Sequence, residues 1–377
     1  MLTGQLEIYL VGGAVRDGLI AENRGNLDDS VAFEQGAGDR DWVVVGSTSE
    51  QLLQLGFKPV GKDFPVFLHP ETKEEYALAR TERKRGQGHT GFSVDANPLV
   101  TLDEDLSRRD LTINAIAQDD SGNLIDPFDG LTDIQMKRLR HVSPAFEEDP
   151  LRVFRVARLA AQLPGFSVAA ETHALMSTMS ARGDLRSLSA ERVWQEFVKA
   201  LAAPEPARFF EVLAACSGLV DWMSECQAIS GSAVATFNPD PQARFALLPL
   251  AAGQHRALAD RLRAPKKFLQ LALDQENHLT SLSSWPRVEA TVLLDLLGQL
   301  RATHETGRLQ SLIGLVESRA VRVKLANQLI PLVQQLKSVV LPEERRSKLS
   351  GSAIGEALDE ERCVYIAEFL SDLPPQS

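Results

Sequence analysis

A change of sequence pattern near Pro144 constrains the fold more than any other feature. Before it, short apolar and β-branched runs alternate with glycine turns and short helical stretches, which is typical of a small sheet with helices. From Asp149 to about Leu370 the pattern is helical, rich in Leu, Ala and Arg, and predicts no strand. The sequence therefore predicts an α+β fold, with a mixed α/β head built on a small antiparallel or mixed sheet and an all-α remainder.

The length of 377 residues is sufficient for two or three domains. We expect residues 1–142 to form the head, residues 143–230 a first helical region and residues 231–377 a second. Prolines predict the breaks between helices, because proline ends or kinks a helix. They are Pro204, Pro206, Pro239, Pro241, Pro265 and Pro286.

Composition excludes several classes of protein. No run of about eighteen apolar residues occurs, so we expect no membrane span, and residues 1–11 lack the pattern of a secretion signal. The chain has three cysteines and no CxxC pair, namely Cys216, Cys226 and Cys363. We therefore expect them to be buried as small hydrophobic side chains in a reducing, cytoplasmic environment. The net charge of −11 means that any RNA contact must come from a local basic surface, for which residues 137–158 are the candidate.

Residues 7–16 predict a strand, a Gly-Gly turn and the start of a helix. Gly12 and Gly13 would let the backbone approach a phosphate, with helix N–H groups and Arg16 as donors. Neither GxGxxG nor GxxxxGK[ST] is present, which disfavours a dinucleotide-binding fold and a P-loop. A Gly-Gly turn is also common as a plain structural turn, so on its own it leaves both a phosphate-binding and a structural role open.

Two carboxylates precede a valine strand. Side chains two apart in a strand point to one side, so Asp39 and Asp41 are predicted to face one site. Such pairs are more often solvated loop acids, but the buried run Val43–Val45 behind this one favours a metal site. Paired carboxylates suit Mg²⁺, and two such ions can activate a hydroxyl and stabilise a departing pyrophosphate.

Further elements follow from local pattern. Residues 66–79 predict an antiparallel hairpin, residues 84–92 a Gly-rich basic loop, and residues 111–117 the start of a helix with Asp110 as its cap. A terminal helix is expected over residues 349–370.

Five motifs occur in the order found in a known family. They are residues 12–17 (GGAVRD), 39–41 (DRD), 108–115 (RRDLTINA), 126–130 (DPFDG) and 148–158 (EDPLRVFRVAR). In this respect the chain resembles the class II tRNA nucleotidyltransferases and bacterial poly(A) polymerases. The resemblance implies a nucleotidyltransferase head followed by a helical neck, body and tail.

The resemblance also implies roles for individual residues. Asp39 and Asp41 would hold the catalytic Mg²⁺. Asp149 and Arg152 would be an amino-acid template that pairs with the base of CTP or ATP. The nucleotide would further be bound by Gly13, Arg16, Arg109, Arg155 and Arg158. On a helix, the three-residue spacing from Asp149 to Arg158 keeps these side chains within one half of the surface, and the last two arginines could reach phosphates or RNA.

The activity implied is addition or repair of the 3′-terminal CCA of tRNA from CTP and ATP, without a nucleic-acid template and with release of pyrophosphate. The alternatives are a poly(A) polymerase, a CC-adding or A-adding enzyme, and an inactive RNA-binding protein. The loop at 84–92 resembles the family's flexible segment, which is thought to help the site switch from C to A addition; this resemblance favours complete CCA addition, and the alternative is a plain surface loop. None of the seven histidines precedes an aspartate, so we expect no HD phosphohydrolase activity. We expect a monomer or a homodimer.

Overall fold

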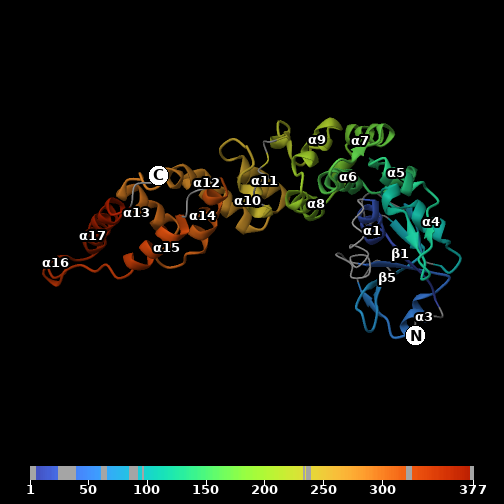
Figure 1. The fold of residues 1–377 in the computed structure, drawn as a ribbon, viewed down its shortest axis with the longest axis horizontal. Helices are drawn as coiled ribbons and strands as arrows, with labels where there is room; N and C mark the ends of the chain where they lie inside the picture. The colour runs from blue at the N-terminus through green and yellow to red at the C-terminus, as the bar shows by residue number, and fades with distance from the viewer. Residues whose placement is uncertain are drawn as a thin grey trace. The chain divides into compact units, whose positions relative to one another are not determined.

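The computed structural model describes residues 6–23, 40–60, 66–84, 92–95, 97–231, 234, 239–319 and 325–373. The chain forms two compact units, Met1–Gly231 and Ser232–Ser377 (Figure 1). The first contains a mixed sheet and the helices that follow it, and the described part of the second is helical. The predicted α+β fold class is confirmed, whereas the division into three domains stays a prediction.

In the described residues, the first unit contains a seven-stranded sheet with the order β3-β4-β5-β2-β1-β8-β9. Strand β2 pairs antiparallel with β1 and parallel with β5, so the sheet is mixed. Strands β4 and β5 form the predicted antiparallel hairpin. The strands are β1 (Glu7–Val11), β2 (Asp41–Val45), β3 (Lys58–Val60), β4 (Val66–Leu68), β5 (Glu75–Leu78), β8 (Ala117–Gln118) and β9 (Leu124–Ile125).

Val43 and Val44 of β2 are buried because both faces of the sheet are covered. Val43 packs with Val11 and Leu106 on one face, while Val44 packs with Phe57 and Leu78 on the other. β-Branched side chains fit such a doubly packed strand. The register pairs Val11 with Asp41, so the first residue of β2 lies beside the turn that follows β1.

Two helices of the head begin at capping boxes. Thr48 and Gln51 cap α3 (Ser49–Gln54), and Thr101 and Glu104 cap α4 (Leu102–Ser107). Helix α4 ends immediately before Arg108. Helix α1 (Gly13–Asn23) starts directly from the glycine turn. Strands β6 (Thr81–Lys84) and β7 (Phe92–Asp95) pair antiparallel, and most of the predicted Gly-rich loop between them lies outside the described residues.

The helix expected over residues 111–117 is wrong. The segment makes one 3₁₀ turn, η4 (Thr112–Asn114), and then enters strand β8, where Ala117 pairs with Val11. Pairing with the sheet therefore overrides the local helical pattern. The Thr112 amide donates to the carbonyl of Arg140 (2.9 Å), which fixes the turn from its other side.

The DPFDG motif fastens helix α5 (Gly130–Gln135) against η4. The Asp126 carboxylate accepts hydrogen bonds from the amides of Gly130 and Leu131, each 2.8 Å long. A Cβ atom on Gly130 would lie 2.3 Å from the Thr112 carbonyl oxygen, so only glycine permits this approach. The motif is thus a structural support for the segment that carries Asp110 and Asn114.

The helices after Pro144 pack around a core of aromatic rings. Phe209 lies 5.8 Å from Phe197 and 6.4 Å from Phe154 between ring centroids. The elements are η5 (Pro144–Glu148), α6 (Leu151–Gln162), α7 (Ala170–Arg182), η6 (Asp184–Ser187), α8 (Ala190–Ala202), α9 (Ala207–Ala215) and η7 (Ser224–Cys226). The expectation of no strand here is wrong in one detail, because β11 (Ser167–Val168) pairs in parallel with β10 (Arg138–Leu139).

The second unit is helical over its described residues, and two of its helices begin at predicted prolines. Pro241 is the first residue of α10 (Pro241–Ala246), and Pro265 immediately precedes α12 (Lys266–Ser283). The others are α11 (Gln254–Leu262), α13 (Ala290–Gln299), α14 (Gly307–Arg319), α15 (Leu325–Leu336), α16 (Glu343–Arg346) and α17 (Ser352–Ser371). No helix in the described part of the chain has the length and apolarity to cross a membrane.

All three cysteines are free. Cys216 and Cys226 are buried, as small hydrophobic side chains would be, while Cys363 is partly exposed. Burial raises the pKa of the Cys216 thiol, which keeps it in its unreactive form.

Candidate active site

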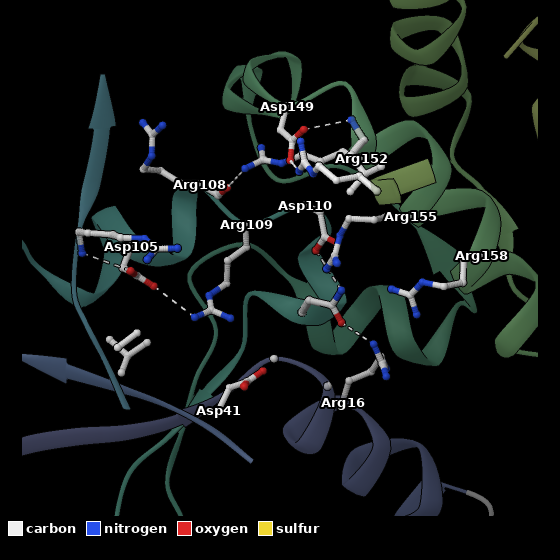
Figure 2. Close-up of a pocket in the computed structure, with 18 residues that line it drawn as sticks. Arg16, Asp41, Asp105, Arg108, Arg109, Asp110, Asp149, Arg152, Arg155 and Arg158 are labelled. Carbon is white, nitrogen blue, oxygen red and sulfur yellow. Dashed lines mark hydrogen bonds and ion pairs between the residues drawn. The ribbon is translucent and has the colours of Figure 1, made fainter. Parts of the chain in front are cut away.

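A cavity of about 630 Å³ in the first unit brings four of the five motifs together. It is lined by eight arginines and four aspartates, an excess of four positive charges that suits a polyanionic ligand. These residues are Arg16, Arg80, Arg108, Arg109, Arg152, Arg155, Arg158, Arg192, Asp41, Asp105, Asp110 and Asp149. Gly12, Gly13 and Asn114 also line the cavity, which Figure 2 shows between the sheet and the helices above it.

The glycine turn lies at the floor of this cavity. Gly12 has φ of +75°, and a Cβ atom there would lie 3.3 Å from Arg109 Nη1 and 3.7 Å from Asp41 Oδ2. A carboxylate and a guanidinium therefore converge on the space beside Gly12, where the positive φ favours glycine. The first turn of α1 follows, so its backbone N–H groups face the same floor.

Asp41 begins β2, and its exposed side chain points into the cavity (Figure 2). A carboxylate oxygen is a hard donor of the kind that Mg²⁺ takes, and the open position at Gly12 lies beside it. The donor type therefore fits the ion. Asp39 lies outside the described residues, so the prediction that both carboxylates face one site stays a prediction.

Arg109 reaches down toward Asp41 from the end of α4 (Figure 2). Its Nη2 pairs with Asp105 (3.3 Å), whose carboxylate also accepts from the Arg80 amide (3.3 Å). Within the described residues, the buried Nε of Arg109 has no hydrogen-bond partner. Asp105 thus holds the guanidinium over the glycine turn with donors left for a ligand.

Asp110 is structural, but not as the predicted helix cap. Its buried carboxylate accepts from the Leu111 amide (2.8 Å) and from Asn114 Nδ2 (3.0 Å), and it pairs with Arg155 (2.8 Å). Burial alone would raise the pKa of this carboxyl, yet Arg155 and Asn114 hold the pKa well below its ordinary value. The carboxylate therefore remains charged and anchors the head segment to α6.

Asn114 continues the same chain of contacts to the turn. Its side-chain oxygen accepts a hydrogen bond from Arg16 Nη1 at 2.7 Å. Arg16 also pairs with Asp17 (2.8 Å). A continuous path of charged and polar groups therefore connects Arg155 on α6 with Arg16 on α1.

The two predicted template residues lie on one wall of the cavity. Asp149 is not helical: it follows η5 in extended conformation (φ −122°, ψ 103°), two residues before α6. Arg152, in the first turn of α6, donates to the carbonyl oxygens of Ala145 (2.7 Å) and Arg108. Both side chains line the cavity, where they offer an acceptor and a set of donors.

Arg155 and Arg158 also line the cavity, but their charges are already balanced. Arg155 pairs with Asp110, which raises the pKa of the guanidinium above its ordinary value. Arg158 pairs with Glu196 on α8 and donates to Gln162. The structure therefore gives both arginines partners within the protein, which makes a direct phosphate contact harder than their spacing suggested.

Several cavity residues were not singled out from the sequence. Arg108 and Asn114 stand inside a quoted motif, so the motif itself could have indicated them. Arg80, Asp105 and Arg192 carry no local signal, because only the tertiary fold brings them to the cavity. An arginine-rich cavity beside a glycine turn and a carboxylate nevertheless defines a class of protein that binds a ligand with several negative charges.

Comparison with known proteins supports this class. The family model for the poly(A) polymerase head domain matches residues 8–140, and one described as a probable RNA and SrmB-binding site of polymerase A matches residues 165–221. A CCA-adding enzyme of Pseudomonas putida is 42% identical over 371 residues, 95% of this chain and 97% of that protein. A multifunctional CCA protein of Methylobacillus flagellatus is 41% identical over 94% of this chain and 95% of its own length. The chain belongs to the CCA-adding enzyme family.

A solved structure shares the fold. The CCA-adding enzyme of Bacillus stearothermophilus in complex with CTP superposes with a TM-score of 0.68, covering 97% of this chain and 91% of that one. The two sequences are 23% identical, so this likeness concerns the fold alone.

Proposed function

We propose that this protein adds or repairs the 3′-terminal CCA of tRNA, using CTP and ATP and releasing pyrophosphate, without a nucleic-acid template. One observation carries the proposal: Asp149 and Arg152, the predicted template pair, line the same cavity as Asp41 and the glycine turn. Family membership supports it, since the relatives compared above are named for CCA addition. We place the activity in the cytoplasm, with the enzyme acting as a monomer or a homodimer.

The charge of the cavity supports triphosphate binding. Arg109 lies over the glycine turn, and the N–H groups at the start of α1 add oriented donors beside it. These groups would bind the phosphates and hold the α-phosphate in line with the RNA 3′-hydroxyl, so the residues accelerate the reaction by positioning and by charge stabilisation. Arg109 would also stabilise the departing pyrophosphate.

Asp41, together with Asp39, would hold Mg²⁺. When bound, the ion would supply positive charge to the reacting phosphate and lower the pKa of the attacking hydroxyl. The contribution of the chain is to place the carboxylate of Asp41 next to the turn, which the pairing of Val11 with Asp41 achieves.

Base selection follows from the donors and acceptors of the template pair. Cytosine and adenine both carry an exocyclic amino group next to a ring nitrogen that accepts hydrogen bonds. The Asp149 carboxylate can accept from the amino group, and the Arg152 guanidinium can donate to the ring nitrogen. Uracil and guanine present a carbonyl and an N–H at those positions, so the same pair would reject them.

The test is incorporation of labelled CTP and ATP into tRNA that lacks its CCA end, with Mg²⁺ present. We expect two C and one A to be added, and Asp41→Ala to reduce the rate by at least about 100-fold because a metal ligand is lost. Addition of A alone to unrelated RNA would instead identify a poly(A) polymerase. Addition of only CC or only A would identify a partial enzyme, and activity unaffected by Asp41→Ala would reject the proposed site.

A further inference from the structure

Arg192, a residue to which no role has so far been given, contacts the template directly. It lies in the first turn of α8, whose N-cap Ser189 accepts a hydrogen bond from the Arg192 amide. Its Nη2 donates to Asp149 Oδ2 at 2.7 Å, although the two residues are 43 positions apart. The side chains are 29% and 28% exposed, so the pair is partly shielded from water at the wall of the cavity.

The contact leaves the Asp149 carboxylate little freedom. Its other oxygen, Oδ1, accepts from the Leu151 amide at 3.1 Å. One bond comes from the backbone at the start of α6 and one from a side chain of α8. Two anchors on different elements fix both the position and the rotation of the carboxylate, as a group that must read a hydrogen-bond pattern requires.

Arg192 is also not fully satisfied by the protein. Its Nη1 is buried, and the described part of the chain offers it no hydrogen-bond acceptor. An unsatisfied buried donor is costly, and such groups are uncommon unless a ligand uses them or a function requires them. The fold thus retains Arg192 beside Asp149 despite that cost, which points to a function for the pair.

We propose that Arg192 is a positioning residue for nucleotide selection: it fixes the Asp149 carboxylate so that only bases with an amino group at pyrimidine C4 or purine C6 are accepted. The inference rests on the proposed function and deepens it. Without Arg192, the carboxylate could rotate away from the amino group or admit a water between itself and a carbonyl-bearing base. CTP and ATP would then bind more weakly, and the penalty for UTP and GTP would shrink.

The test is Arg192→Met, which retains the length of the side chain and removes its charge and donors. We expect the KM for both CTP and ATP to rise about 10-fold or more, with kcat changed less, because base binding is lost. The preference for CTP over UTP, as a ratio of kcat/KM values, should fall about 10- to 100-fold. Arg192→Lys, which can still donate to Asp149, should recover part of that preference.

The matched control is Arg208→Met. Arg208 pairs with Glu211 at 2.9 Å with similar exposure (37% and 29%), but it does not line the cavity. This variant should leave nucleotide preference unchanged. If Arg192→Met does not fold, Arg192→Gln, which keeps a neutral donor, carries the comparison and should lose an intermediate share of the preference.

A double variant with Asp149 tests whether Arg192 acts by positioning Asp149 or only by supporting the fold. If Arg192 acts through Asp149, then Asp149→Asn combined with Arg192→Met should select no worse than Asp149→Asn alone. Additive losses would overturn the inference, as would wild-type preference in a folded Arg192→Met or Arg192→Gln. Failure of the unmodified protein to add C or A to tRNA would instead reject the proposed function itself.

Discussion

At the scale of single residues, Gly12 sets the distance between the cavity floor and the groups above it. Asp41 and Arg109 both approach the space where its side chain would be. Asp41 could be anticipated from the valine strand behind it, and Gly12 from the turn. The pairing of Asp149 with Arg192 could not, because no local pattern links two residues 43 positions apart.

Gly12→Ala should reduce activity far more than stability. The added Cβ would lie 3.3 Å from Arg109 Nη1, forcing the guanidinium away from the phosphates, so kcat/KM for CTP should fall at least about tenfold. Gly46→Ala is the matched control: its φ is +68°, but nothing lies within 4 Å of the new atom. Both should cost about 1 kcal/mol of stability through backbone strain. Equal activity in the two variants would refute the role of this contact.

Asp110→Asn should lower the free energy of unfolding by about 3 kcal/mol at neutral pH. This value is near the low end of the range for breaking a buried ion pair, because the side chain of Arg155 is 37% exposed. The folded-state pKa of Asp110 is lowered, so its stabilisation is present above the unfolded pKa of about 3.9 and is lost as the pH falls through the folded value. Urea unfolding from pH 7 to pH 3 should therefore show a smaller loss in Asp110→Asn than in the wild type. Adding Arg155→Met should restore part of the stability at pH 7; no recovery would contradict the pairing.

At the scale of elements, the sequence pattern predicted the helices, strands and turns that are determined by neighbouring residues. The strand of β2, the glycine turn before α1, the hairpin of β4 and β5, and the proline-marked helix starts all depend on neighbouring residues. The segment 111–117 depended instead on distant partners, namely β1 and the carbonyl of Arg140. Its helical pattern was therefore misleading. The position of Asp149 before rather than within α6 did have a local signal, because Pro150 follows it and a residue before proline favours an extended backbone.

The contact between α5 and η4 offers a test at this scale. Gly130→Ala would place a Cβ atom 2.3 Å from the Thr112 carbonyl, so α5 must shift, and we expect a loss of about 2–3 kcal/mol in the free energy of unfolding. Thr132→Ala, an exposed change in the same helix, should alter stability by less than about 0.5 kcal/mol. Denaturant unfolding of both variants measures the difference. A Gly130→Ala variant as stable as Thr132→Ala would show that the close approach is not needed.

At the scale of the whole molecule, an acidic chain contains a basic cavity. The net charge of −11 coexists with a cavity whose arginines exceed its aspartates by four. The overall charge of the chain therefore does not indicate the charge of its ligand. The order of the motifs in the sequence does indicate the family. The local fold then brings residues from four motifs, with Arg80, Asp105 and Arg192, to one cavity.

The most direct measurement is the sequence of the RNA 3′ end after reaction. Purified protein is given tRNA lacking CCA, Mg²⁺ and all four nucleoside triphosphates together, and the products are sequenced. The proposed function predicts that most ends read CCA and that addition stops there, with U and G rare. Ends that carry runs of A, or U and G as often as C and A, would contradict both the function and the template assigned to Asp149 and Arg152.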